Sequence, residues 1–461
     1  MLAPERTIAK RGSCVKDVAS RTDSRMTALP VPTSSAAAVE PLAQPAADAQ
    51  GWGVLCVLCF VYVLNFLDRQ LLSILAKPIQ DALHVTDGQL GLIGGLYFAF
   101  FYCFIAVPVG WFADKSNRVA VLSLACAIWS GATMCCGFAS TYPQLVVARM
   151  TVGFGEAGGV PPSYALITDM FPPGRRGTAL GIYNLGPPIG AALGIAFGAS
   201  VAAAFDWRYA FITIGAVGLI TAAMVRLFVR EPVRGRFDVN AAHSAPSSFS
   251  ETLRMFFSRR TLVLAALGSG ATQFITYGLA NFATLFLMRE KGMTLREVAV
   301  YYALAAGIGM SSGMVVSGRV IDRLTRRSKA AYATVPALSL AFALPFYVAF
   351  VWAPTWPLAL FFLTGAMMLN YFYLSSSVAL VQEEVRPDQR VMSGALLLLV
   401  MNFVGLGLGP TYVGAASDWF RAHGVPHALQ VALYTLTPFY VVAIVIFLSL
   451  ARALRREGAA A

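Results

Sequence analysis

Four charged residues lie within long apolar stretches of this sequence: Asp68, Arg69, Arg149 and Glu156. A charge near the centre of a lipid bilayer costs at least about 2.5–3.5 kcal/mol, so these four require a specific role. A carboxylate beside an arginine stays ionised, but it takes up a proton when a conformational change leaves it unpaired in an apolar environment. We therefore predict that Asp68 and Glu156 carry protons and that Arg149 is the switching counter-ion. Arg69 is predicted to bind an anion.

The spacing of three of these residues predicts how deep each one lies in the membrane. Asp68 lies about eight residues before the end of the first predicted helix, and Arg149 lies about seven residues into the fourth. Both therefore sit roughly 10–12 Å below the same membrane face. Arg149, Gly153 and Glu156 share one helix face, with Glu156 about 10 Å deeper. A buried ion-pair network that only holds the two helices together is the structural alternative.

Polar side chains beside these charges extend the predicted binding site. Tyr62 and Asn65 share a helix face with Arg69 and are predicted to contact the same ligand. Gly153 and Gly155 lack side chains, so another helix or a ligand can approach them closely.

The elements that position these residues are predicted to be transmembrane helices. Hydrophobic residues make up 57% of the 461 residues and charged residues only 13%, too few to cover a water-soluble surface. Apolar runs of about 18 residues or more can cross a hydrocarbon core, and in lipid such runs must be helical. The sequence predicts twelve, at approximately 52–76, 90–113, 119–140, 142–168, 177–204, 208–229, 261–288, 298–317, 330–352, 355–380, 391–416 and 428–451.

The net charge of +12 is explained by membrane topology. Most of the 35 Lys and Arg residues lie in the loops on one side of the predicted helices. The positive-inside rule then places both termini in the cytoplasm, and a bacterial inner membrane is expected. Nucleic-acid binding is not expected from this distribution.

Other chemistries lack the residues that they need. The seven cysteines lie almost entirely within apolar runs, and the four histidines lie in loops or at helix ends. The sequence contains no metal-ligand cluster, no nucleophile–base pair within the membrane and no phosphate-binding G-x-x-x-x-G-K-[ST] motif. We therefore predict no enzymatic activity, no metal and no cofactor.

The chain is organised around an internal repeat. Residues 1–50 are predicted to be a disordered cytoplasmic tail, 51–229 and 261–455 two six-helix bundles, and 230–260 a cytoplasmic linker. A loop motif of glycine, acid, base and arginine recurs after the second and eighth predicted helices, with its two copies 208 residues apart. Its residues are Gly110, Asp114, Lys115 and Arg118 in the first copy and Gly318, Asp322, Arg323 and Arg326 in the second.

Seven of these loop residues are predicted to form a conformational latch: Gly110, Asp114, Lys115, Arg118, Asp322, Arg323 and Arg326. Asp114 and Asp322 end helices at the face where the fifth and eleventh helices begin, near Gly177 and Val391. The positive N-terminal dipoles of those helices would attract a carboxylate from the opposite half. Such contacts would exist only while that face is closed. The alternative is a plain turn that fixes topology.

The second half offers polar, uncharged groups within its helices. Gln273, Tyr277 and Asn281 follow one another at spacings of four residues and so form one stripe. Asn370, Tyr373 and Asn402 lie on two later helices. All six are predicted as ligand contacts, although an isolated Asn or Gln in a membrane helix more often forms a hydrogen bond between helices.

The repeated loop resembles the signature of the major facilitator superfamily. The resemblance covers about residues 51–455 and implies an all-α membrane protein of twelve helices. In that fold, two six-helix bundles related by a pseudo-twofold repeat surround a central cavity and rock between inward-open and outward-open states.

Two groups within that superfamily share the buried charges. Asn65 to Arg69, Arg149 to Ala157 and Asp114 to Arg118 resemble motifs of spinster-type lipid transporters, with Gly155 and Asn117 favouring this group. The resemblance implies a proton-linked carrier of lysophospholipids or sphingoid phosphates, with the proton and headgroup sites on the four buried charges. Organic anion symporters, which carry sugar acids, share N-x-x-D-R and the Arg–Glu pair.

Two departures keep other readings open. Gly158 to Pro162 is flexible and apolar where spinster members often carry polar residues, which bears on headgroup recognition. Gly186 to Gly190 resembles the G-P-x-x-G signature of drug–proton antiporters. The sequence thus predicts a proton-coupled transporter of an amphipathic lipid that works as a monomer, with protons and membrane lipids as its other partners. An organic-anion symporter is the alternative and a drug antiporter the remote one.

Overall fold

The structure is a computed structural model that describes residues 49–234, 249–386 and 389–460. The described residues belong to one compact unit and are helical throughout, with no strand among them. Almost all of the tail predicted at 1–50, and residues 235–248 of the predicted linker, lie outside this range.

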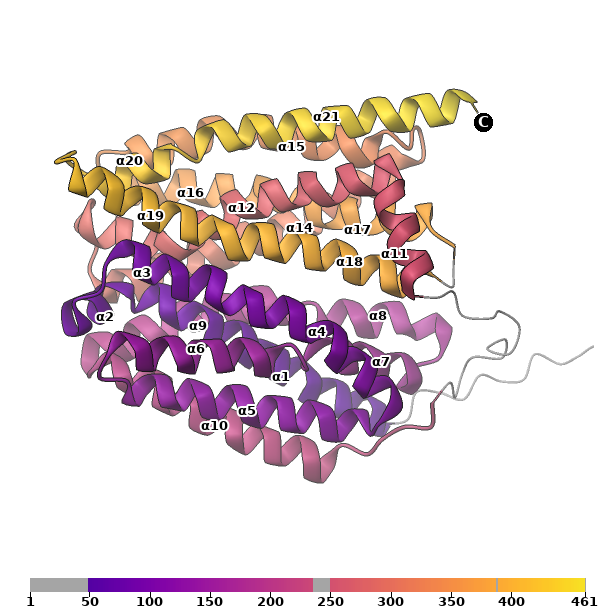
Figure 1. Ribbon diagram of the computed structural model, residues 1–461, viewed down its shortest axis with the longest axis horizontal. Coiled ribbons are helices and arrows are strands. Elements are labelled where there is room, and N and C mark those ends of the chain that lie inside the picture. Colours follow the sequence, from indigo (N-terminus) through magenta and orange to yellow (C-terminus); the bar gives the residue numbers. More distant parts are fainter. Residues whose placement is uncertain (1–48, 235–248, 387–388, 461) are drawn as a thin grey trace, which may run out of the picture. The chain divides into compact units, whose positions relative to one another are not determined.

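The helices of the first half are as follows: α1 (Ala49–Ile74), α2 (Ala76–Leu83), α3 (Asp87–Leu92), η1 (Ile93–Tyr97), α4 (Phe98–Lys115), α5 (Arg118–Phe138), α6 (Tyr142–Glu156), α7 (Val160–Met170), α8 (Pro173–Tyr183), α9 (Gly186–Ala204) and α10 (Trp207–Phe228). Those of the second half are α11 (Phe249–Ser258), α12 (Arg260–Arg289), α13 (Leu295–Glu297), η2 (Val298–Tyr302), α14 (Ala303–Thr325), α15 (Ala331–Trp352), α16 (Trp356–Asn370), α17 (Phe372–Glu384), α18 (Arg390–Asn402), η4 (Phe403–Leu408), α19 (Gly409–Ala422), α20 (Ala428–Tyr434) and α21 (Thr437–Ala460). Here η marks a π-helical segment. Figure 1 shows these helices running roughly side by side.

Eleven spans in the described ranges are long and apolar enough to cross a membrane, judged by length and composition. The fourth predicted helix is absent from these spans because the chain breaks it into α6 and α7 at residues 157–159. Gly158 and Gly159 disfavour helix at the break, and Pro161 starts the next helix within its first turn. Together, α6 and α7 correspond to the fourth predicted helix. With this pair added to the eleven spans, the described residues are consistent with twelve transmembrane helices.

Further breaks interrupt helices that the sequence predicted as continuous. The chain changes helix at residues 184–185 and at Tyr371, and π-helical turns lie within three other spans. Residues 249–258, within the range predicted as linker, form helix α11.

The internal repeat extends to details of helix geometry. The capping boxes of Thr86 with Gln89 and of Thr294 with Glu297 have the same separation as the two loop motifs. A π-helical segment follows each box. Ser73 and Asn281, 208 positions apart, are hydrogen-bonded to each other across the two halves. Repeat-equivalent positions therefore meet where α1 contacts α12.

The two ends of the unit differ in how the halves meet, and we name each after a residue. The Asp87 end contains α2, the start of α3 and the end of α12 (left in Figure 1). The Arg118 end contains the α4–α5 turn and the end of α14. In the described ranges, hydrogen bonds and ion pairs between the halves lie toward the Asp87 end, where α3 packs on α19 and α9 on η2.

Candidate functional site

The four charged residues predicted from the sequence come together where α1 lies near α6. The side chains of Asp68, Arg149 and Glu156 are buried, and that of Arg69 is 10% exposed. Each carboxylate pairs with one arginine of the other helix. Two ion pairs therefore join α1 to α6, and their formal charges cancel.

The first ion pair is Asp68 with Arg149. Arg149 donates from Nη1 to Asp68 Oδ1 at 3.3 Å, and the Thr133 hydroxyl donates to Asp68 Oδ2 at 2.6 Å. Both oxygens of Asp68 are thus satisfied. Thr133 was not identified from the sequence, because a single threonine in an apolar helix carries no distinguishing signal.

The second ion pair is Arg69 with Glu156. Arg69 donates from Nε to Glu156 Oε2 at 2.6 Å. The other oxygen, Oε1, is buried and has no hydrogen-bond partner in the described part of the chain. A buried acceptor without a donor costs about 1–3 kcal/mol, and more when it is charged. A proton on Oε1 would remove the negative charge that no donor compensates at this oxygen.

The helix break places Glu156 in an unfavourable electrostatic position. Glu156 is the last residue of α6, where the carbonyl groups give the helix end a partial negative charge. A carboxylate there is destabilised unless a cation lies beside it. Arg69 supplies that cation.

Aromatic rings surround the two arginines. The Arg69 guanidinium carbon lies 4.5 Å from the Tyr102 ring centroid and 5.3 Å from that of Phe98. The Arg149 guanidinium carbon lies 5.5 Å from the same Phe98 ring. Cation–π contacts of this kind stabilise a guanidinium without neutralising it. Tyr62 lies on the same helix as Arg69 and stacks on Tyr183, with ring centroids 4.4 Å apart.

Glycines in α6 allow other helices to approach. A Cβ atom at Gly153 would lie 2.7 Å from the Phe98 carbonyl oxygen, and one at Gly155 would lie 2.6 Å from the Trp129 backbone nitrogen. Both positions therefore serve helix packing. Asn117, the other residue that favoured spinster over its relatives, caps α5 by accepting a hydrogen bond from Ala120 N at 2.7 Å.

The G-P-x-x-G segment of α9 also packs closely. Added Cβ atoms at Gly186 and Gly190 would collide with Tyr62 and with the Val63 carbonyl oxygen of α1. The glycines of this segment thus allow α9 to lie directly against α1.

The polar residues of the second half are divided between separate places. Tyr277 interacts electrostatically with Arg69 and so brings the second half to the charged site. Gln273 donates from Nε2 to Asn402 Oδ1 at 3.4 Å. Asn65 is buried on α1, and its Oδ1 has no hydrogen-bond partner within the described residues.

Of the other three residues, two have hydrogen bonds of their own. Asn281 accepts the hydrogen bond from Ser73 at 3.3 Å, toward the Asp87 end. Asn370 donates to the Tyr440 hydroxyl at 2.9 Å in the interior of the second half. Tyr373 is buried.

The residues of the predicted latch lie at the Arg118 end. The first-copy arginine, Arg118, donates from Nη1 to Asp169 of α7 at 2.6 Å and from Nε to Glu231, just after α10, at 2.7 Å. Lys115 lies over the Trp111 ring, and Gly110 has open space around it. The Asp114 side chain is outside what the structure describes.

The second copy of the motif is exposed. Asp322, Arg323 and Arg326 are on the surface and make no ion pair with the described residues. The latch across the two halves stays a prediction for a state that is closed at the Arg118 end.

Replacement of Arg118 by alanine is expected to destabilise the first half. It would remove the arginine that pairs with Asp169 and Glu231, two buried or half-buried carboxylates, and breaking such a pair costs about 3 kcal/mol. The expected result is an unfolding midpoint in detergent several degrees lower. Lys115→Ala, in the same turn but exposed, is the control. An equal midpoint for both variants would contradict a structural role for the Arg118 ion pairs.

The structure also contains a charged cluster that the sequence did not reveal. Asp87, fully buried at the start of α3, accepts hydrogen bonds from Arg289 at 2.9 and 3.0 Å, and from Ser417 at 2.6 Å and Arg421 at 2.5 Å. Asp418 in turn accepts from Gly88 N at 2.8 Å. Gln80 donates from Nε2 to Asp87 Oδ1 at 2.6 Å. We call these residues the Asp87 cluster: Gln80, Asp87, Arg289, Ser417, Asp418 and Arg421.

The Asp87 cluster joins the two halves. Gln80 and Asp87 lie in the first half, whereas both arginines, Ser417 and Asp418 lie in the second. The spacing of Ser417 and Arg421 places them on one helix face, but nothing in the sequence connects that face with Asp87 or Arg289. No group of three or more potential metal ligands occurs among the residues that the structure describes.

Comparison with known proteins decides the family. The model of the Major Facilitator Superfamily matches residues 58–410, more than half of the chain. The chain belongs to the major facilitator superfamily. Its family and fold are therefore those of membrane transporters, consistent with a multi-pass membrane protein.

The chain is similar to relatives of three different kinds. The chain is 31% identical to an MFS-type efflux pump of Mycolicibacterium smegmatis, over 80% of this chain and 85% of that one. It is 26% identical to protein spinster homolog 3 of Danio rerio, over 78% and 76% of the two chains. It is 25% identical to the hexuronate transporter of Bacillus subtilis, over 79% and 87%.

A solved structure supports the spinster resemblance. A bacterial homologue of the human lysosomal transporter spinster, in an inward-facing and unoccupied conformation, aligns with a TM-score of 0.82 and 28% identity. The alignment covers 89% of this chain and 98% of that one. The likeness to spinster proteins that the motifs predicted is thereby confirmed.

Proposed function

We propose that this chain is a proton-coupled transporter of an amphipathic lipid with an anionic or zwitterionic headgroup. The observation that carries the proposal is the Arg69–Glu156 ion pair, with its second carboxylate oxygen buried and unpaired. The pair is neutral overall, so its Arg69–Glu156 contact can be replaced by two ligands from outside, one bound to each residue.

Those two ligands are a proton and an anion. A proton on Glu156 removes the negative charge that holds Arg69, and the freed guanidinium can then bind a phosphate or carboxylate in a bidentate manner. The site remains neutral when both are bound and also when neither is. This charge balance favours carrying a proton together with an anion over carrying either alone, because an unpaired charge in this buried site is costly.

Asp68 is proposed as a second proton carrier. Its carboxylate is stabilised by Arg149 and Thr133 from two other helices, α6 and α5. A movement of α6 away from α1 would remove the cation, and the carboxyl group would then favour its neutral form. Arg149 thus acts as the counter-ion that switches with conformation.

Several features support a lipid as the substrate. The spinster resemblance spans most of the chain, and the aromatic rings of Phe66, Phe98 and Tyr102 lie beside Arg69. Aromatic rings beside a cation suit a molecule with an acidic head and an apolar body. A small organic acid is the second candidate, favoured by the similarity to a hexuronate transporter.

The proposed setting is a bacterial inner membrane with both termini in the cytoplasm and one chain as the working unit. The excess of Lys and Arg in the loops on one side supports this orientation. The Arg118 end would then face the cytoplasm, and a unit joined at its Asp87 end would correspond to an inward-facing state.

The proposal is tested by proton movement in proteoliposomes that contain a pH-sensitive dye. Wild-type protein is expected to acidify the lumen when a lysophospholipid is supplied and not when a hexuronate is supplied. Asp68→Asn is expected to abolish the signal, because the amide cannot carry a proton.

Three other outcomes would contradict parts of the proposal. A signal with hexuronate alone would identify an organic-anion symporter. A signal with neither, together with proton release driven by a hydrophobic cation, would favour efflux, as in the mycobacterial relative. Equal proton flux in wild type and Asp68→Asn would reduce the buried charges to a structural role.

A further inference from the structure

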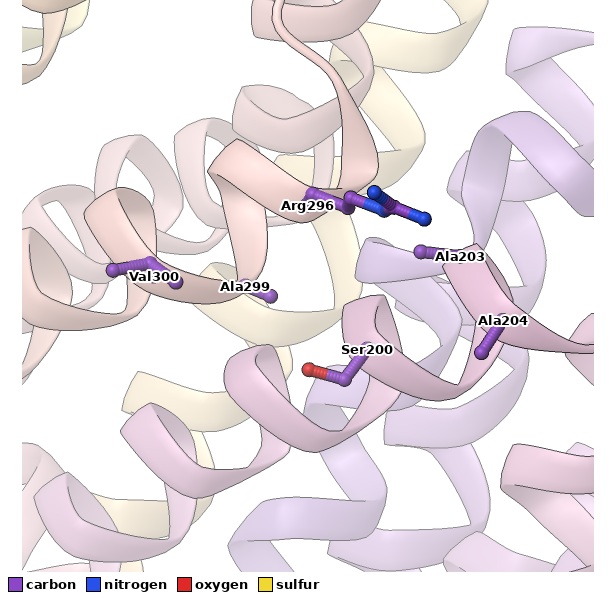
Figure 2. Close-up of a pocket in the computed structure, with 6 residues that line it drawn as sticks. All are labelled: Ser200, Ala203, Ala204, Arg296, Ala299 and Val300. Carbon is purple, nitrogen blue, oxygen red and sulfur yellow. The ribbon is translucent and has the colours of Figure 1, made fainter.

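A crevice lies between the two halves at the Asp87 end. The residues that line it are distant in sequence from the four buried charges. It has a volume of about 270 Å³ and is bordered by α9 on one side and by α13 and η2 on the other. Figure 2 shows the residues that line it: Ser200, Ala203, Ala204, Arg296, Ala299 and Val300.

The crevice results from the divergence of two packed helices. Nearer the start of α9, an added Cβ at Gly307 of α14 would lie 3.2 Å from the Ala192 side chain, so the two helices nearly touch there. Ser200 lies about two turns beyond Ala192, roughly 12 Å along the helix. At that level the alanines of α9 do not fill the space that opens.

Arg296 gives this crevice a positive charge. Its side chain is exposed and extends toward Ala203 across the crevice in Figure 2. It forms no hydrogen bond or ion pair within the described ranges. The neighbouring acid Glu297 is occupied by the capping box of Thr294. The guanidinium is therefore available to an external anion.

Neighbouring residues indicate the level of the crevice in the membrane. Tyr301 packs against Trp356 with ring centroids 5.3 Å apart, and such residues prefer the boundary between membrane and water. From there, Val300, Leu304 and Ile308 continue along η2 and α14 with 53–60% of their surface exposed. A positive group at the boundary thus adjoins an apolar surface suited to acyl chains.

We propose that this crevice binds the phosphate-bearing headgroup of an anionic phospholipid from the surrounding bilayer. Arg296 binds the phosphate in a bidentate manner, and the Ser200 hydroxyl donates a further hydrogen bond. The acyl chains lie along the apolar surface that begins at Val300. This lipid is a bound cofactor of the fold and not the transported molecule, so the site is independent of the proposed substrate.

The position of the crevice gives the lipid an effect on conformation. Ser200 belongs to the first half and Arg296 to the second, so one headgroup contacts both. The crevice exists only while α9 and α13 lie close together. Since a ligand stabilises the state to which it binds, the lipid favours closure of the Asp87 end.

The experiment measures lipid retention by the purified full-length chain with native mass spectrometry, using phosphatidylglycerol and phosphatidylcholine. Wild type is expected to retain one phosphatidylglycerol more tightly than phosphatidylcholine. Arg296→Gln is expected to weaken phosphatidylglycerol binding about tenfold, since it removes charge-assisted hydrogen bonds. Ser200→Leu, which fills the crevice without changing charge, should also weaken binding.

Lys291→Gln is the matched control, because it removes a positive charge at the Asp87 end but outside the crevice. Its retention of phosphatidylglycerol is expected to equal that of wild type. Equal retention by wild type and Arg296→Gln would overturn the proposal, and so would equal binding of the two lipids by wild type.

Discussion

Replacement of Asp87 by alanine is expected to shift the chain toward a state that is open at the Asp87 end. The variant leaves Arg289 and Arg421 of the second half without the acid that binds both. Removing one partner of a buried ion pair costs about 3–5 kcal/mol. Because the two arginines are 25% and 48% exposed, we expect about 2 kcal/mol, or roughly a thirtyfold change in the conformational equilibrium.

The shift is measured as a distance between spin labels on the two halves. Labels at Ser140 and Thr355 occupy exposed loop positions, one in each half. A longer distance should become populated in Asp87→Ala. Asp81→Ala is the control, because Asp81 is also acidic and lies six residues before Asp87, and within the described residues its ion pair is with Lys77 of its own helix. The role of the Asp87 cluster is refuted if both variants keep the wild-type distance.

Replacement of Glu156 by glutamine is expected to separate substrate binding from proton coupling. The amide keeps an oxygen that can accept from Arg69 Nε but removes the negative charge that holds the arginine. The anion should therefore bind without a proton. We expect affinity to become independent of pH, whereas wild-type affinity should fall about tenfold per pH unit when the carboxylate is ionised.

Transport assays make the separation visible. Counterflow of labelled substrate, which needs no gradient, should persist in Glu156→Gln, and uptake driven by a proton gradient should be lost. Glu290→Gln, a carboxylate outside the buried site, should leave both unchanged. Gradient-driven uptake at wild-type level in Glu156→Gln would exclude this carboxyl group as the coupling site.

The proximity of Asp68 and Arg149 could be predicted from the sequence, but the partner of Arg69 could not. Counting residues from the helix ends put Asp68 and Arg149 at one level, and the two are indeed paired. The same count placed Glu156 about 10 Å deeper and gave no partner for Arg69. That pairing depends on how α1 and α6 cross, which spacing along one helix does not determine.

The breaks in the helices could also be predicted only in part from the sequence. Glycines and prolines near 158–162 indicated a flexible segment, and the structure ends α6 there. The π-helical turns at 93–97 and 403–408 carried no such signal. They contact each other across the two halves, so their geometry reflects packing between segments distant in sequence.

The Asp87 cluster shows why inter-half contacts are hard to predict. Its members come from four segments, and each residue is unremarkable in its own surroundings: an acid after a capping threonine, or an arginine after an apolar run. Charge pairing across such distances requires the fold to be known first.

The hydrogen bond between Ser73 and Asn281 has a consequence for the ancestry of the fold. The two residues are counterparts in the internal repeat, and in a symmetric pair only positions on the twofold axis touch their own copies. The surfaces around this bond thus meet as an isologous interface does, but within one polypeptide. A true homodimer would have to form the contact from two identical side chains. Gene fusion removes that requirement, so one copy can hold a hydroxyl donor and the other an amide acceptor.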